Sequence, residues 1–409
     1  MEVTRPSRRR HPLRSVVARI ADQLTCYAAT APGVESLVAA ELRGLGLVPG
    51  ATEPGGVEFL AATADLVRAL LWLRTATRVT VRIAEFRAAA FGELERHAAK
   101  VPWQRLIAEG AAVHFRVTSK KSRLYHNDAI AERLERAVLA AVPGTRAIRA
   151  PSAAEELEAD ATRVPEVQRV VVRASRDIFT LSIDAAGALL HRRGWRQEVA
   201  KAPLRETLAA TMLLACGWEG ALPLVDPLCG SGTIAIEAAL LARRIAPGRH
   251  RRFAAEAWPS LPPSVWAVAR ADAKSLERES DTPIAGADRD AGAIAAAQAN
   301  AERAGVGEAV EFTRATISGL APDNGEGWLI TNPPYGSRIG ERTGLRDLYA
   351  VLGRVLRERR PHWHLGMLSA DRMLERQIGF PLHEILRTNN GGIPVRVVRS
   401  DDRSAIIDS

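Results

Sequence analysis

The sequence predicts a C-terminal doubly wound α/β domain with a mostly parallel, Rossmann-like sheet, preceded by an α+β region that begins with a ferredoxin-like unit. Three apolar segments, residues 222–226, 283–288 and 329–331, have the length and composition of buried strands, and each is followed by small, polar or aromatic residues. Ligands of doubly wound sheets bind beyond the carboxyl ends of the strands. We therefore expect these three strand ends to form one site.

The first 85 residues predict a short arm and a small α+β unit. Residues 1–22 are arginine-rich and poor in apolar side chains, which predicts a basic, disordered arm. Residues 23–85 alternate between strand and helix periodicity in a β-α-β-α-β order. The expected strands are 24–30, 56–61 and 78–84, and the expected helices are 34–43 and 66–74.

Residues 86–187 predict a second α+β unit. Helical spacing covers 92–107 and 129–141, a strand is expected at 113–117, and 167–174 with 178–183 reads as a hairpin. One strand end carries positive charges beside aromatic rings, which suits phosphate contact with base stacking, although a solvated loop is the alternative. These residues are Lys120, Lys121, Arg123, Tyr125 and His126.

The third domain, residues 188–409, begins with a glycine-containing loop at 226–233. Gly230 and Gly232 allow positive φ and close approach of a ligand to the backbone. A helix expected over 234–244 presents free N–H groups that attract a carboxylate, while Asp226 can pair with an ammonium group. Carboxylate and ammonium together fit the amino-acid part of S-adenosylmethionine. A nucleotide phosphate is the competing ligand, but neither GxxxxGK[ST] nor a full GxGxxG is present.

The strand 283–288 ends in Asp288, where an acidic residue can hold ribose hydroxyls. Residues 246–280 lengthen the distance from the glycine loop and form an insertion. The remaining expected elements are helices 291–304, 345–357 and 372–378, strand 365–369, and a possible antiparallel edge pair near 385 and 395–397.

The segment Asn332, Pro333, Pro334 and Tyr335 suits methylation of a flat exocyclic amine. The lone pair of such an amine is delocalised into the ring. An amide oxygen and a main-chain carbonyl can accept its two N–H groups and favour a tetrahedral nitrogen, while the prolines fix φ and the tyrosine stacks on the ring. A simple turn that ends a strand is the alternative interpretation.

Composition predicts a cytoplasmic protein with a polyanionic partner. The chain has 409 residues, a net charge of +9 and three cysteines without a CxxC pair, so neither a disulfide framework nor a structural zinc site is expected. No apolar run is long enough for a membrane span. Base composition of the genome could also explain the arginine content. Basic residues cluster at 5–14, 192–205 and 243–252.

Five motifs within residues 24–400 resemble bacterial THUMP-containing RNA guanine-N2 methyltransferases, which include the ribosomal large-subunit enzyme and its transfer-RNA relatives. The motifs are 31–35 (APGVE), 193–196 (RGWR), 202–210 (APLRETLAA), 226–233 (DPLCGSGT) and 332–336 (NPPYG).

This resemblance implies a ferredoxin-like piece (23–85) and a THUMP module (86–187) that present structured RNA to a class I methyltransferase (188–409). It implies target-base roles for Asn332, Pro333 and Tyr335, to which we add Pro334. Thr316 stands where many class I enzymes have an adenine-binding aspartate. The cofactor-binding residues expected for S-adenosylmethionine are Asp226, Pro227, Cys229, Gly230, Ser231, Gly232, Thr233, Asp288 and Thr316.

The resulting hypothesis is methylation of guanine N2 in structured RNA, either 23S rRNA or tRNA. The expected partners include no metal and no membrane, and a monomer is favoured. The alternatives are amino-methylation of DNA adenine or cytosine, methylation of protein glutamine, and a noncatalytic RNA-binding assembly factor. The expected RNA-binding residues are Lys120, Lys121, Arg123, Arg193, Arg196, Lys201 and Arg205.

Overall fold

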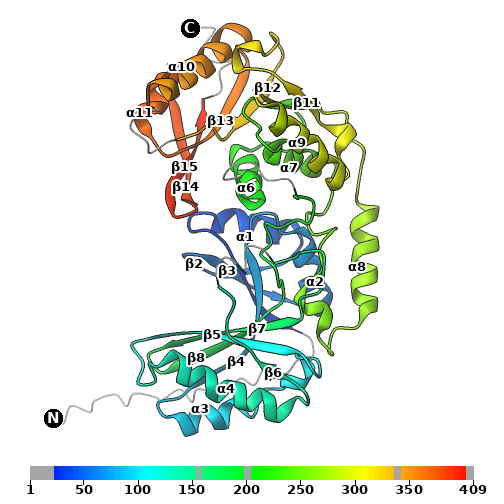
Figure 1. Cartoon of the computed structure of the whole chain (residues 1–409), viewed down its shortest axis with the longest axis vertical. Helices are drawn as coiled ribbons and strands as arrows, with labels where there is room; N and C mark the ends of the chain where they lie inside the picture. Colours follow the sequence, from blue (N-terminus) through cyan, green and yellow to red (C-terminus); the bar gives the residue numbers. More distant parts are fainter. Residues whose placement is uncertain (1–22, 153–154, 156–158, 198–203, 336–341, 402–409) are drawn as a thin grey trace, which may run out of the picture.

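The computed structural model describes residues 23–401, apart from 153–154, 156–158, 198–203 and 336–341. The predicted arm 1–22 and Lys201 lie outside the described residues. The chain forms two lobes, each built on one sheet, and the N-terminal lobe lies below the C-terminal lobe in Figure 1.

The N-terminal lobe contains one eight-stranded sheet with the order β2-β3-β1-β4-β8-β7-β5-β6. The sheet continues across the two predicted units because β4 pairs antiparallel with β8, with Val81 opposite Ile183. The division at residues 85 and 86 remains a prediction. The strands are β1 (Leu24–Ala29), β2 (Pro49–Glu53), β3 (Gly56–Ala61), β4 (Arg78–Arg87), β5 (Ala112–Lys120), β6 (Arg146–Ala147), β7 (Val167–Ser175) and β8 (Ile178–Asp184).

Four helices share one hydrophobic core with these strands: α1 (Glu35–Gly44), α2 (Thr63–Trp72), α3 (Phe91–Ala98) and α4 (Asn127–Ala141). The expectation of one helix over 92–107 is wrong. Helix α3 ends at Ala98, and only a 3₁₀ turn (Trp103–Arg105) follows Pro102. Proline has no N–H and disfavours the α conformation in the residue before it, so the helix cannot continue.

The C-terminal lobe contains a seven-stranded sheet with the order β11-β10-β9-β12-β13-β15-β14. The strands from β11 to β13 are parallel, and β15 runs antiparallel to both β13 and β14. This arrangement confirms the predicted doubly wound domain. The strands are β9 (Leu224–Asp226), β10 (Ile284–Asp288), β11 (Glu311–Arg314), β12 (Gly327–Thr331), β13 (Trp363–Ser369), β14 (Leu382–Asn390) and β15 (Ile393–Ser400).

Helices cover both faces of this sheet. Alternate strand residues such as Leu224 and Val225 belong to different hydrophobic clusters, as expected for strands buried on both sides. The side chains of α6, α7 and α9 belong to one cluster and those of α10 and α11 to the other. These helices are α6 (Glu206–Cys216), α7 (Thr233–Ala242), α9 (Ala291–Ala304), α10 (Arg342–Arg359) and α11 (Arg372–Glu375).

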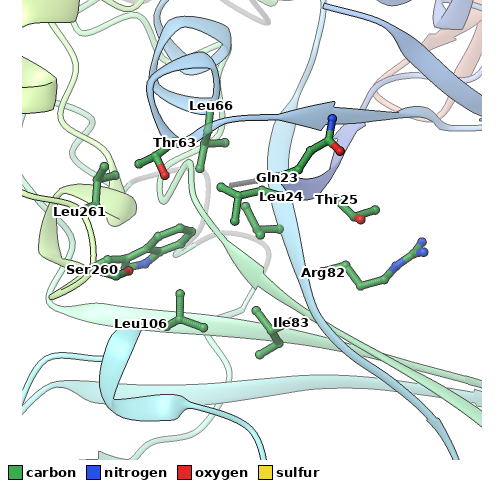
Figure 2. A pocket seen from close by; sticks show the side chains of 12 residues that line it. Gln23, Leu24, Thr25, Thr63, Leu66, Arg82, Ile83, Leu106, Ser260 and Leu261 are labelled. Atoms are coloured by element: carbon green, nitrogen blue, oxygen red, sulfur yellow. The ribbon is translucent and has the colours of Figure 1, made fainter. Parts of the chain in front are cut away.

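The insertion 246–280 belongs structurally to both lobes. It contains a 3₁₀ turn (Ala254–Ala257) and helix α8 (Pro263–Ser275), which runs alongside the lobes and packs against α2 (Figure 1). Phe253 and Trp258 lie in the N-terminal core, and Trp258 Nε1 donates to Gln168 Oε1 of β7 over 2.8 Å. Figure 2 shows the small, mostly apolar cavity between this segment, α2 and β4. The insertion therefore fixes the two lobes to each other.

Candidate functional site

The glycine loop and the asparagine-proline segment meet at the carboxyl edge of the C-terminal sheet. Strand β9 lies between β10 and β12, so the loop after β9 and the segment after β12 are neighbours. The Thr331 hydroxyl, at the end of β12, donates to Asp226 Oδ1 over 2.7 Å. Asn332 is the next residue in the chain after Thr331, so its backbone lies beside this hydrogen bond. The fold therefore brings the two segments together, and their role as one ligand site remains a prediction.

Asp226 is a buried carboxylate beside a second acid. Its side chain is 2% exposed, and Oδ1 also accepts from Leu228 N over 3.1 Å. Burial raises the pKa of Asp226 to about 7, and the charge of Asp288 adds to the rise. A cationic ligand in contact with this carboxylate would favour its ionised form.

A hydrogen bond to the Asp288 carboxylate fixes the backbone of the glycine loop. Gly230 N donates to Asp288 Oδ2 over 3.1 Å, and φ at Gly230 is 51°. A Cβ at Gly230 would meet no atom within 4 Å, so open space borders the backbone there. Gly232 has another role: its φ is 84°, and a Cβ would lie 2.9 Å from the Phe312 ring. Gly230 leaves room for a ligand, whereas Gly232 allows close packing of the loop.

Several side chains form hydrogen bonds that hold the glycine loop and the start of α7 in place. Arg196 Nη2 donates to Thr233 Oγ1 over 2.7 Å, at the first residue of α7, and Arg196 Nε lies 3.3 Å from Glu206 Oε1. Asn300 on α9 is fully buried and donates to the Ser231 carbonyl over 3.2 Å. These contacts fix the N-terminal end of α7, where free N–H groups attract an anion.

The other expected cofactor residues differ in exposure. Pro227 and Cys229 are buried, and Cys229 N donates to the Ala287 carbonyl over 2.9 Å. Burial raises the pKa of the Cys229 thiol, so it stays protonated and serves as a packed side chain. Thr316 is exposed at the carboxyl end of β11, with Oγ1 3.1 Å from Ser318 Oγ. Its position lies one strand beyond Asp288, at the rim of the site.

Asn332 and Tyr335 have the features needed to hold a flat amine. Asn332 Oδ1 is buried and has no hydrogen-bond partner within the described part of the chain. Such an oxygen carries an energetic cost that a donor from a ligand would remove. The Tyr335 ring is half-buried, and its hydroxyl accepts from Asn390 Nδ2 over 2.7 Å. Pro333 is buried and Pro334 is exposed.

The predicted RNA contacts divide into exposed and buried residues. Arg193 is 1% exposed and donates to Glu237 and to the carbonyls of Leu190 and Arg74, so its predicted RNA contact is wrong. The same prediction is wrong for Arg196, whose guanidinium is bonded to the glycine-loop helix. Arg251, within the basic cluster 243–252, is also buried and donates to carbonyls. The exposed residues of the set are Lys120, Lys121, Arg123 and Arg205.

Three residues of the site had no recognisable pattern in the sequence. Thr331 reads as the last residue of an apolar strand, Asn300 as a polar residue on a helix, and Asn390 as part of a hairpin turn. Their contacts cross between elements far apart in the chain. Only the strand order brings them to the site, so spacing within the sequence could not reveal them.

The described residues give two further findings about possible ligands and surroundings. No group of three or more His, Cys, Asp or Glu side chains among them is arranged to hold a metal ion. None of the helices within 23–401, gaps excepted, combines the length and apolar character needed to span a bilayer.

A seven-stranded sheet of this order, with a glycine loop after β9, is typical of class I methyltransferases. Residues 193–396 match a family model described as the RMKL-like methyltransferase domain, and residues 25–80 match the RlmL ferredoxin-like domain. The chain belongs to this RMKL-like methyltransferase family. The family assignment confirms the predicted fold, and the cofactor is S-adenosylmethionine.

Relatives match along nearly the whole chain. "Putative RNA methyltransferase slr0064" of Synechocystis sp. is 33% identical over 91% of this chain and 95% of that protein. The ribosomal RNA large subunit methyltransferase K/L of Syntrophotalea carbinolica is 37% identical over 92% of this chain, which spans only 53% of that protein.

Solved structures share the arrangement of both lobes. A protein from Listeria monocytogenes, described as a predicted N6-adenine-specific DNA methylase, has a TM-score of 0.79 and 31% identity and covers 93% of this chain and 96% of its own. A second structure, described as "SMU.472, a putative methyltransferase complexed with SAH", has a TM-score of 0.79 and 27% identity and covers 93% of this chain and 98% of its own.

Proposed function

We propose that this chain methylates the exocyclic N2 amine of a guanosine in structured RNA. The observation that carries the proposal is the Thr331–Asp226 hydrogen bond. This bond links the ends of β12 and β9 and supports a position of Asn332 next to the glycine loop. The Asn332 oxygen is buried and has no hydrogen-bond partner among the described residues. A donor in the loop and an amine at Asn332 would thus share one site, and catalysis would come from positioning and electrostatics.

The cofactor side of the site assigns roles to the loop residues. S-adenosylmethionine supplies an electrophilic methyl group. Asp226 and the N-terminal end of α7 suit its ammonium and carboxylate groups, and the open space at Gly230 admits the ligand to the backbone. Asp288 suits ribose hydroxyls. Pro227, Cys229, Ser231, Gly232 and Thr233 shape the loop, and Thr316 borders the adenine side.

The base side assigns roles to the segment after β12. Asn332 Oδ1 and the Pro333 carbonyl accept the two N–H groups of the amine and draw its lone pair out of the ring. Tyr335 stacks on the base, and Pro334 restricts the backbone between them. The amine nitrogen would bond to the methyl carbon as the bond from that carbon to the sulfonium sulfur breaks, with the neutral thioether as the leaving group. The nitrogen would then lose a proton to water, so no strong general base is needed. The base must leave its stack to enter such a site.

RNA is the substrate class that the relatives and the N-terminal lobe favour. Two relatives, from Synechocystis sp. and Bacillus subtilis, carry the description "Putative RNA methyltransferase", and this chain covers 95% and 89% of their lengths. Exposed Lys120, Lys121 and Arg123 lie near the Tyr125 ring, which is 65% exposed, and suit phosphate contact with stacking. We place the enzyme in the cytoplasm, with 23S rRNA or tRNA as its substrate and a monomer as its working form.

Asn332→Ala tests this assignment. The variant should lose at least about a hundredfold in RNA methylation, because the amine loses its acceptor in a preorganised site. Calorimetry should show S-adenosylmethionine binding within about twofold of wild type, because the side chain faces the base rather than the donor. Asn324→Ala, at an exposed asparagine before β12, serves as the matched control. Loss of cofactor binding in Asn332→Ala, or retained methylation, would show that Asn332 has another role.

A further inference from the structure

We propose that Asn390, at the tip of the β14–β15 hairpin, is a positioning residue that sets the orientation of Tyr335 for base stacking. The inference rests on the proposed function and extends it to an element that lies outside both sequence motifs. Asn390 would not touch the reacting atoms. It would act through the tyrosine hydroxyl.

The contact itself is short and direct. Asn390 Nδ2 donates to the Tyr335 hydroxyl over 2.7 Å, between residues that are 55 positions apart. The Tyr335 ring packs against the hydrophobic cluster beneath the sheet, and its exposed part remains available to a ligand. The packing restricts one side of the ring, and the hydrogen bond fixes its far end.

The turn that follows Asn390 does not require an asparagine at this position. Gly391 and Gly392 have φ values of 58° and 89° and make the two-residue turn of the hairpin. Glycine adopts this conformation without strain, so no side chain is needed to stabilise the turn. The Asn390 carboxamide is therefore available to donate a hydrogen bond to Tyr335.

The hairpin provides a fixed support for this hydrogen bond. Strand β15 pairs with β13 in the interior of the sheet, with Leu368 opposite Val397. On the other side, the loop before α1 lies directly against β14. A Cβ added at Gly33 would lie 1.9 Å from the Arg387 carbonyl oxygen. Strand β14 thus lies between β15 of the catalytic sheet and the N-terminal lobe, which is the lobe expected to bind RNA.

A fixed ring orientation matters for this chemistry. Tyrosine that rotates freely must be ordered each time a base enters, and that ordering opposes formation of the reactive geometry. A ring already held by Asn390 stacks without this loss. Removal of the hydrogen bond should therefore slow methylation more than it weakens RNA binding, and it should leave the donor site unchanged.

The test compares Asn390→Ala, Tyr335→Phe and the double variant in steady-state RNA methylation. Asn390→Ala should lower kcat by about fivefold to tenfold, the size expected for one hydrogen bond, with KM for RNA within about twofold of wild type. Because Asn390 acts only through the hydroxyl, the double variant should match Tyr335→Phe alone. Calorimetry should show unchanged affinity for S-adenosylmethionine.

Two controls keep the result interpretable. Asn389→Ala changes the exposed neighbour and should resemble wild type. Asn390→Asp keeps a partner for the phenol, which can donate to a carboxylate, and should recover most of the activity even if Asn390→Ala folds poorly.

Three results would overturn the inference: wild-type kcat in Asn390→Ala, effects that multiply in the double variant, or an effect limited to a higher KM for RNA. Failure of the proposed function would look different, because the wild-type chain itself would then not methylate RNA, and both proposals would fall together.

Discussion

At the scale of single residues, the site contains two polar groups that are buried at an energetic cost. The Asp226 carboxylate is buried beside another acid, and Asn332 Oδ1 is buried with no donor among the residues that the structure describes. Each costs free energy in the absence of a ligand. A cation at Asp226 and an N–H group at Asn332 would remove both costs. The free protein therefore has favourable binding positions for two different ligands.

The pKa of Asp226 predicts that cofactor affinity depends on pH. A positively charged donor favours the ionised carboxylate, so binding below pH 7 must first remove a proton from Asp226. The dissociation constant should then rise by about tenfold per pH unit below 7 and level off above it. Calorimetry between pH 5.5 and 8.5 measures this. Asp226→Asn should flatten the curve, and an equally steep curve in that variant would assign the titration to another group.

The same pKa predicts the effect of Asp226 on stability. Its pKa in the folded chain lies above the ordinary value of 3.8, so the folded state holds the proton more tightly. That contribution to stability is present below pH 3.8 and is lost as pH rises to about 7, at a cost of at most roughly 4 kcal/mol. Asn at 226 stays neutral and can accept the same two hydrogen bonds. Urea unfolding at pH 8 without cofactor should show Asp226→Asn to be more stable than wild type; lower stability would contradict the account.

At the scale of elements, substitutions at the two glycines of the loop should differ in their effects on stability and on cofactor binding. Gly232→Ala introduces a Cβ 2.9 Å from Phe312 and 3.0 Å from Ala297 at positive φ, so it should destabilise the fold by about 2–4 kcal/mol. Gly230→Ala meets open space and should cost only about 1 kcal/mol of backbone strain. The added Cβ would occupy the open space where the ligand is expected. The substitution should therefore weaken cofactor binding more than the loss of stability explains. Urea unfolding and calorimetry on both variants test this ordering.

Elements defined by local patterns were predictable, and elements that depend on distant partners were not. The helix Ala291–Ala304 matches its prediction at both ends because Asp290 caps it and Gly305 ends it in the left-handed conformation. Strand β2 and helix α6 were not predicted. Strand β2 is polar and mostly exposed, and α6 is buried nearly all around, so neither shows amphipathic periodicity.

The same distinction explains which site residues could be predicted. Residues within the two motifs share a loop or a strand end, so their proximity follows from the expected sheet order. The charge of Arg193 and Arg196 suggested a surface that binds RNA. The Arg193 guanidinium instead points into the junction between the lobes, and the Arg196 guanidinium donates to Thr233 at the start of α7. The composition gives the number of arginines, but it does not show which of them form hydrogen bonds or ion pairs with buried partners.

At the scale of the whole molecule, a buried ion-pair network joins the lobes. Glu237 on α7 is fully buried, 3.1 Å from Arg193 Nε and 3.8 Å from Nη1 of Arg74 in the N-terminal lobe. Glu237→Gln removes the carboxylate that faces two buried guanidinium groups, which should cost about 3–5 kcal/mol. Glu279→Gln breaks an exposed pair with Arg243 and should cost less than about 1 kcal/mol. Equal unfolding free energies for the two variants would show that the network does not stabilise the junction.

The most direct test of the central claim is to identify the methylated nucleoside. The wild-type chain is incubated with deuterium-labelled S-adenosylmethionine and, separately, with total RNA, genomic DNA and a glutamine-containing release factor. The nucleosides and peptides are then analysed by mass spectrometry. We expect labelled N2-methylguanosine in RNA from the wild-type reaction and none from Asn332→Ala. Label on adenine, cytosine, a ring carbon, DNA or protein would contradict the account, and so would equal labelling by the Asn332→Ala variant.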